Sequence, residues 1–142
     1  MVQRAMHTYS VQLRISGAEL CPDEITDQIG LEPNQVRRKG QPRSTKELWP
    51  ESMWSYDGSS DGQVREWSNL EEGLSSVMDA LWPKRASIGA YSRHFHVIWW
   101  CGHFQSSFDG GPTLSVALLE RLGEFGVPLY LDNYFSDADE TE

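Results

Sequence analysis

Two histidines, His94 and His96, have the spacing of side chains that share one face of a β-strand. Residues two apart on a strand point the same way and lie about 7 Å apart. Two imidazoles so placed suit zinc, provided that His103 or a carboxylate completes the site. His103 has the opposite parity, however, and the spacing specifies no third ligand. Histidines that face water are the alternative, and we favour it over a metal site.

The basic residues concentrate in one segment. Its members are Arg37, Arg38, Lys39 and Arg43. Planar guanidinium groups favour carboxylate or phosphate, and Gly40 lets a ligand approach the backbone closely. One interpretation is a site for an anionic ligand between this segment and the sheet. The other, which we favour, is that the segment pairs with the protein's own carboxylates, such as Glu24 or Asp27.

Residues 95–101 are apolar on both faces, which predicts a central strand covered on both sides. Alternation places Trp99 on one face and Trp100 on the other. One face is expected to meet the helices, and the other to lie on the helix-free side, near Gln12 and Arg14. An exposed tryptophan there would be a contact surface for a partner. The alternative, which we favour, is that a loop or helix covers this face and makes both tryptophans core residues.

Catalytic signatures do not occur in the chain. It contains no nucleophile elbow, zinc-protease helix, kinase signature or phosphate-binding glycine loop. Cys21 precedes a predicted helix, where thiolates are stabilised, but Asp23 and Glu24 oppose an anion there. We therefore predict no catalytic residue and no cofactor.

The elements that must position these residues follow from hydrophobic periodicity and turn residues. Alternation predicts a strand over 9–16, and two isoleucines one turn apart predict a helix over 22–30. Ser68 and Glu71 form a capping box that opens a second helix, 68–82. The other predicted elements are a helix over 114–126, strands at 35–38, 53–56, 95–101 and 129–134, and a loop at 39–52. Pro83 weakens the helix 68–82, and the apolar Ile88 and Tyr91 leave open a second short helical piece after it.

Two of the predicted strand–helix–strand units end their helices alike. Gly30 and Gly126 each precede an apolar residue, and a proline follows before the next strand. This pattern is typical of a left-handed glycine whose successor packs back on the helix. The fold class is therefore predicted to be α+β, a ferredoxin-like, split βαβ sheet with helix 68–82 added. The repeat is either a duplication or a coincidence.

The length and net charge of the chain predict its domain organisation and argue against some classes of function. The 142 residues fit one α/β domain at 9–135, with an N-terminal extension at 1–8 and an acidic disordered tail at 136–142. The net charge of −9 argues against a nucleic-acid partner. No apolar run reaches the ~20 residues of a membrane span. Two distant cysteines indicate reduced thiols, and hence the cytoplasm.

The order of these motifs resembles a family. The residues that carry this resemblance are 22–26 (Pro-Asp-Glu-Ile-Thr), 29–33 (Ile-Gly-Leu-Glu-Pro), 38–42 (Arg-Lys-Gly-Gln-Pro), Trp54, Leu70-Glu71 and Asp132. From Tyr9 to Tyr134 the chain resembles the bacterial domain-of-unknown-function 4279 family. The resemblance implies no activity and no catalytic residues. By analogy with other small bacterial proteins, it suggests an immunity or antitoxin-like partner protein.

Three functional hypotheses follow, and the first is preferred. The first is a non-enzymatic interaction module, an immunity-type inhibitor of a basic toxin or enzyme, because the chain is acidic and rich in Trp and Tyr. The second is a sensor of a small anionic ligand, and the third a metal-dependent hydrolase that uses His94 and His96. Self-association through sheet edges, as a homodimer, is compatible with all three. The candidate binding residues are Arg14, Arg37, Arg38, Lys39, Arg43, Trp54, Trp99 and Trp100.

Overall fold

A computed structural model describes residues 7–59 and 64–136. These residues form an α+β fold with one five-stranded sheet and four α-helices. The elements in chain order are β1 (His7–Gly17), α1 (Pro22–Ile29), β2 (Gln35–Arg37), β3 (Ser52–Tyr56), α2 (Leu70–Leu81), the short 3-10 helix η1 (Trp82–Lys84), α3 (Arg85–Tyr91), β4 (His96–Gln105), α4 (Val116–Phe125) and β5 (Leu129–Phe135).

The sheet has the strand order β2-β3-β1-β4-β5. β1 pairs antiparallel with β3 and with β4, whereas β4 and β5 are parallel. Because β2 is antiparallel to β3, it runs in the same direction as β1, and β3 is inserted between them. In the unit β4-α4-β5, by contrast, the two parallel strands are adjacent.

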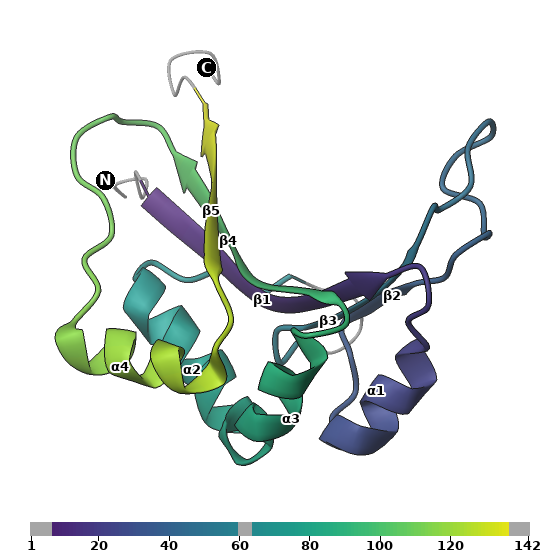
Figure 1. The fold of residues 1–142 in the computed structure, drawn as a ribbon. Coiled ribbons are helices and arrows are strands. Elements are labelled where there is room, and N and C mark those ends of the chain that lie inside the picture. The colour runs from purple at the N-terminus through teal and green to yellow at the C-terminus, as the bar shows by residue number, and fades with distance from the viewer. Residues whose placement is uncertain (1–6, 60–63, 137–142) are drawn as a thin grey trace.

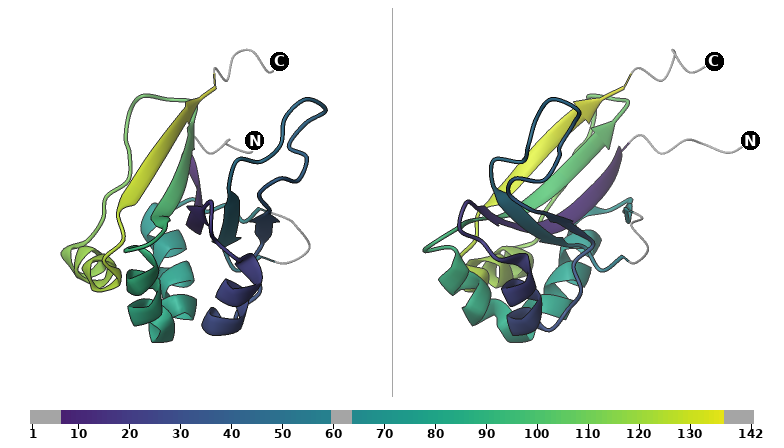
Figure 2. Two further views of the ribbon diagram at one scale, coloured as in Figure 1. Left: turned by 45° about the vertical axis from the view of Figure 1, so that its right-hand side comes forward. Right: turned by 90° about the vertical axis from the view of Figure 1, so that its right-hand side faces the viewer.

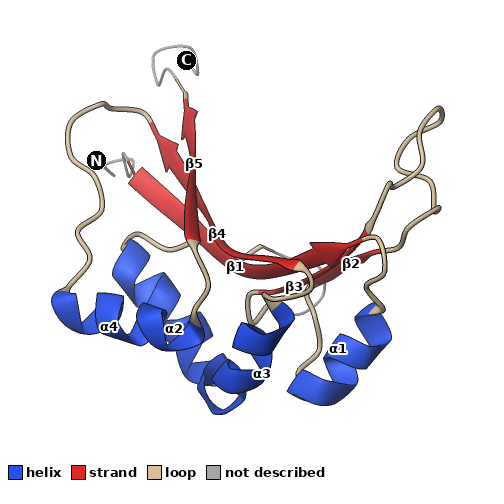
Figure 3. Ribbon diagram, viewed as in Figure 1, coloured by secondary structure: helices blue, strands red, loops and turns tan. Residues whose placement is uncertain are grey.

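All four α-helices lie on one face of the sheet (Figures 1 and 3). No helix of the described residues covers the opposite face, which we call the helix-free face. The sheet curves, and the helix-free face lies on the inner side of the curve (Figure 1). Strand residues that point toward the helices form the core with the apolar stripes of the helices. Its largest fully buried side chains include Trp54, Trp99 and Phe125.

Most of the predicted elements are present within a few residues of their expected bounds. The two glycine-terminated helices are confirmed, because α1 ends at Gly30 (φ 80°) and α4 ends at Gly126 (φ 67°), both left-handed. A side chain at either position would strain the backbone. After Gly126, Val127 is buried in the core, as the predicted return to the helix requires.

The start of the second helix was predicted one residue too early. Asn69, not Ser68, is the N-cap of α2, and its side chain accepts a hydrogen bond from the backbone N–H of Glu72. The carboxylate of Glu71 instead accepts hydrogen bonds from the backbone N–H (2.7 Å) and hydroxyl (2.8 Å) of Ser115. Since Ser115 is the N-cap of α4, the predicted capping acid joins two helices.

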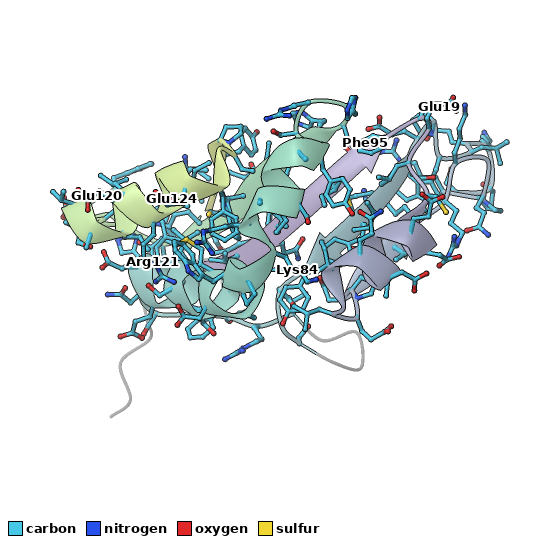
Figure 4. The ribbon with its side chains drawn as sticks, turned by 60° about the horizontal axis from the view of Figure 1, so that its bottom comes forward. Glu19, Lys84, Phe95, Glu120, Arg121 and Glu124 are labelled. Atoms are coloured by element: carbon cyan, nitrogen blue, oxygen red, sulfur yellow. The ribbon has the colours of Figure 1, made fainter. Side chains whose placement is uncertain are left out.

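The helix layer contains a fourth helix in the segment that Ile88 and Tyr91 left open. After Pro83 the chain continues as α3, whose Ile88 is fully buried. The outer surface of this layer carries charges of both signs, as Figure 4 shows for Glu120, Arg121 and Glu124 on α4 and for Lys84. Arg121 pairs with Asp79 of α2 and lies over the ring of Trp82. Mixed exposed charges of this kind are ordinary for a solvated helix surface.

Candidate functional site

The helix-free face is built from rows of cross-strand partners, because paired residues on neighbouring strands point the same way. One row runs from Arg37 on β2 through Met53 and Ser16 to His96 on β4. The next row contains Ser55, Arg14 and Ile98. Positive side chains of β2 and β1 therefore alternate with apolar side chains of β3 and β4 across a face that no described helix covers.

Residues 38–51 form an arm between β2 and β3 that extends away from the helices (Figures 1 and 2). Its two branches are tied by backbone hydrogen bonds from Gly40 to Trp49 (2.9 Å) and from Trp49 to Gln41 (2.9 Å). Gly40 has φ 85°, a conformation that glycine adopts without strain. The predicted loop is therefore a hairpin-like projection with Trp49 at its base.

A pocket of about 300 Å³ lies between the base of the arm and the helix-free face. We call it the arginine pocket. Its lining residues come from the arm and from β1, β2, β3 and β4. They are Arg14, Ser16, Arg37, Arg43, Trp49, Pro50, Glu51, Met53, His96 and Ile98. This volume is at the lower end of the range of small-molecule sites.

The arginine pocket brings three guanidinium groups together with one carboxylate, that of Glu51. In the described parts of the chain, the ion pairs closer than 4.0 Å are Arg38–Asp23 and Arg121–Asp79. Neither pair contains Arg14, Arg37 or Arg43. The expected pairing of the basic segment with the protein's own carboxylates is therefore present only at Arg38, and its partner is Asp23 rather than Glu24 or Asp27. Arg38 lies outside the pocket lining.

Arg14 is held on the sheet by two contacts. Its Nε donates to Oε1 of the buried Gln12 (2.9 Å), and its guanidinium lies 4.1 Å from the ring centre of Trp100. Burial lowers the pKa of Arg14, and the positive charge of Arg37 lowers it further. A guanidinium remains protonated despite such shifts. The lowered pKa means that the charge of Arg14 is partly removed from water and repelled by the charge of Arg37. An anion bound beside Arg14 would offset both effects.

Arg37 and Arg43 share the ring of Trp49. Their guanidinium carbons lie 4.3 Å and 5.1 Å from its centre. Burial lowers the pKa of Arg37, and the charge of Arg43 adds to this effect. The Nε of Arg37 is buried without a hydrogen-bond partner in the described residues. An unpaired buried donor is costly, so a ligand that accepts from this guanidinium would stabilise the pocket.

The remaining candidate residues separate into surface and core. Lys39 is exposed on the arm, and its backbone N–H donates to the hydroxyl of Ser52. Trp100 lies on the helix-free face near Gln12 and Arg14, as expected for one of the two strand faces. It is 8% exposed, because Arg14 covers its ring and its Nε1 donates to Asp132.

The structure removes Trp54 and Trp99 from the candidate binding residues. Both side chains are fully buried on the face that the helices cover. The indole N–H of Trp54 donates to the hydroxyl of Thr26 on α1 (3.0 Å), and the ring of Trp99 meets Phe125 edge-on. Neither ring can touch a ligand or partner at the surface, so both belong to the core.

The structure does not bring His94, His96 and His103 together. In the described ranges no group of three or more His, Cys, Asp or Glu side chains is placed to hold a metal ion. His96 lines the arginine pocket, while His94 precedes β4 and is exposed. His103, the expected third ligand, is buried and hydrogen-bonded to His7 (2.8 Å).

The sequence patterns did not predict several residues of the pocket lining. Trp49 had the clearest signal among them, because a lone tryptophan in the polar loop 39–52 indicates that the loop packs against another part of the protein. Met53 and Ile98 were assigned to strands, but nothing in their alternation tells which face lacks helices. Glu51 carries no spacing signal at all. Their positions follow from sheet order, which residue patterns do not encode.

The two cysteines are free thiols in different surroundings, because Cys21 is exposed and Cys101 is buried. Burial raises the pKa of the Cys101 thiol to about 12, so it stays protonated at neutral pH.

Within the described residues, every helix is too short or too polar to traverse a bilayer.

Comparison with known proteins identifies one family. The model of a family described as "Domain of unknown function (DUF4279)" matches residues 7–136, which is nearly the whole chain. No curated protein and no solved structure matches the sequence. The matched range starts at the first residue of β1 and ends just after β5, so it contains the complete sheet and the arginine pocket. The protein therefore belongs to the DUF4279 family.

Proposed function

We propose that this protein is a non-catalytic module that binds a small anionic ligand in the arginine pocket. The observation that carries the proposal is the convergence of Arg14, Arg37 and Arg43 on one cavity without a carboxylate partner within 4.0 Å in the described residues. The protein as a whole carries a net charge of −9, so unpaired arginines gathered in one place are not an effect of composition. Arginine forks bind carboxylates and phosphates through paired hydrogen bonds.

A thermal-shift experiment tests this proposal. The melting temperature is measured with the sodium salts of phosphate, sulfate, acetate, succinate and citrate, each compared with chloride at the same ionic strength. A ligand at 100 times its dissociation constant stabilises the native state by about 2.7 kcal/mol, which is several degrees for a domain of this size. We expect at least one organic anion or phosphate to give such a shift.

The matched variants are Arg37→Gln and Arg38→Gln. Both remove one positive charge from adjacent positions, but only Arg37 lines the arginine pocket, whereas Arg38 pairs with Asp23. Arg37→Gln is expected to weaken anion binding at least tenfold, and Arg38→Gln less than twofold. The proposal fails if no anion exceeds chloride, or if the two variants lose binding equally.

A second candidate function is the interaction module, the immunity-type inhibitor of a basic toxin or enzyme. The observation that favours it is the exposure of aromatic side chains on β4, on β5 and in the segment between β4 and α4, with two stacked pairs, Phe104–Tyr134 and Phe108–Phe135. These exposed side chains are Phe104, Phe108, Tyr130, Tyr134 and Phe135. Aromatic residues are enriched at protein interfaces. The test is capture of a basic partner that weakens with added salt and that is lost in Tyr130→Ser but retained in Arg37→Gln.

We also propose finer assignments that accompany either function. The protein is a bacterial cytoplasmic protein with no nucleic-acid partner. Its sheet is a ferredoxin-like variant, in which β3 lies between the two parallel strands of the β1-α1-β2 unit. The sheet ends in β2 and β5, so its two outer edges offer a route to a homodimer. Light scattering at micromolar concentration distinguishes a monomer of 16.2 kDa from a dimer.

A further inference from the structure

The cations of the arginine pocket form two groups that different elements hold. Arg37 of β2 and Arg43 of the arm lie on the ring of Trp49. Arg14 of β1 lies on the ring of Trp100 instead, and Gln12 fixes its Nε. Each group therefore has its own aromatic support, and neither group relies on the other for its position.

The backbone separates these two groups. β3 lies between β2 and β1, so Arg37 and Arg14 are two strand spacings apart. Along the strands they lie in neighbouring rows of the helix-free face, because Arg37 pairs with Met53 and Arg14 with Ser55. Two strand spacings and one two-residue step place their Cα atoms on the order of 10 Å apart. The two guanidinium groups also lie on different rings, that of Arg14 on Trp100 of β4 and that of Arg37 on Trp49 of the arm.

Apolar side chains lie beside both groups. Met53 of β3 lies between Arg37 and Arg14 on the helix-free face, and Pro50 of the arm is part of the same lining. Ile98 of β4 continues the apolar lining on the far side of Arg14. An inorganic anion would leave this apolar surface in contact with water. A ligand with a hydrocarbon body would cover it, at a gain of roughly 25 cal/mol per Å² removed from water.

We propose that the ligand is an organic dianion with one acidic group on Arg37 and Arg43, the second on Arg14, and a short hydrocarbon body over Met53. This inference rests on the proposed anion-binding function and narrows it to two-ended acids such as aliphatic dicarboxylates. The repulsion between the arginines supports it. Each of Arg14 and Arg37 has a lowered pKa, from burial first and then from a neighbouring guanidinium, and two anionic groups neutralise both ends of the pocket.

The experiment compares dicarboxylates of three to eight carbons with monocarboxylates of equal carbon number. Dissociation constants of the full-length protein are measured by calorimetry at pH 7.5 and constant ionic strength, with inorganic phosphate as a further probe. We expect an optimum at intermediate length, where the dicarboxylate binds at least tenfold tighter than its monocarboxylate. Arg14→Gln is expected to erase this advantage, and the control Arg38→Gln to preserve it.

The outcomes separate the two proposals. If monocarboxylates and dicarboxylates bind equally and Arg37→Gln removes both, the two-ended ligand is wrong but anion binding stands. If phosphate binds tighter than every dicarboxylate, a single multivalent anion replaces the two-ended one. If no anion binds, both proposals fail. The length series in the wild-type protein decides the question even if Arg14→Gln does not fold, and Arg14→Lys, which keeps the charge, provides a second variant.

Discussion

Adjacent residues of one type have different roles in this protein. Arg37 and Arg38 carry the same charge, but Arg37 lines the arginine pocket while Arg38 bonds to Asp23 of α1. Trp99 and Trp100 divide in the same way, with Trp99 in the core and Trp100 beneath Arg14 on the helix-free face. Strand alternation explains the difference between the two tryptophans, whereas Arg38 comes directly after β2 ends at Arg37. Residue type alone therefore says little about function here, and the position of each residue within or beyond its strand decides it.

Trp54 illustrates how a candidate surface residue becomes a core residue. Its ring is fully buried, and its N–H is satisfied by the Thr26 hydroxyl, which in turn donates to the carbonyl of Pro22. Removing that hydroxyl leaves a buried donor unpaired. We expect Thr26→Val, which keeps the side-chain shape, to lower the free energy of unfolding by about 1–3 kcal/mol.

Urea denaturation measures this change, and Thr26→Ser is the matched control because it keeps the hydroxyl and loses only a methyl group. A smaller loss in Thr26→Ser than in Thr26→Val is expected. Equal losses in the two variants would show that the methyl group, not the hydrogen bond to Trp54, matters at this position.

The elements were largely predictable because each has a local cause. Alternation predicted β1, and the glycines that end α1 and α4 adopt the expected left-handed conformation. The predictions failed where a tertiary contact replaced the local one. Glu71 fits the capping-box pattern, but its carboxylate bonds to Ser115 at the start of α4 rather than to its own helix. The local pattern is the same in both cases, so the sequence alone does not distinguish them.

The contact between Glu71 and Ser115 predicts a pH-dependent loss of stability. Two hydrogen bonds from Ser115 lower the pKa of Glu71, so the folded state favours the carboxylate. A lowered pKa stabilises the protein above the ordinary pKa of a glutamate, and this contribution is lost as pH falls through the folded value. We expect Glu71→Gln to lower the free energy of unfolding at pH 7 and to resemble the wild type in acid.

Denaturation curves at pH 7 and at pH 3 to 4 test this expectation, with Glu72→Gln as the control. Glu72 occupies the same helical turn, and its own link to the cap is through the backbone N–H, so its substitution changes the helix-end charge without removing the bridge to α4. If Glu72→Gln reproduces the effect, the helix dipole and not the Ser115 contact is responsible.

On the scale of the whole molecule, the site depends on features that sequence patterns do not record. Arg14 and Arg37 are distant in the chain, and they face one cavity because β1 and β2 belong to the same sheet, with β3 between them. The arm completes that cavity by placing Trp49 over the edge of the sheet. The overall charge concealed this arrangement, since a net charge of −9 coexists with a positive pocket. The α+β class was predictable from local periodicity, whereas the pocket required the strand order.

The curved sheet and its helix layer also determine how the whole protein responds to alkali. Burial raises the pKa of Cys101 to about 12, and it raises the pKa values of Tyr9, Tyr56 and Tyr91 as well. For an acid with a raised pKa, the unfolded chain loses its proton first, so the folded state binds more protons. Stability is therefore complete below about pH 9, the ordinary thiol value, and declines as pH rises toward 12.

We expect the free energy of unfolding to fall between pH 9 and pH 10.5, and Cys101→Ala to reduce the steepness of that fall. The slope is compared rather than the absolute stability, because Cys101→Ala also leaves a small cavity in the core. Cys21→Ala is the control, since the Cys21 side chain is exposed. An unchanged slope in Cys101→Ala would assign the alkaline loss to the tyrosines, whereas a reduced slope locates it at the centre of β4, where the helix layer excludes water from the thiol.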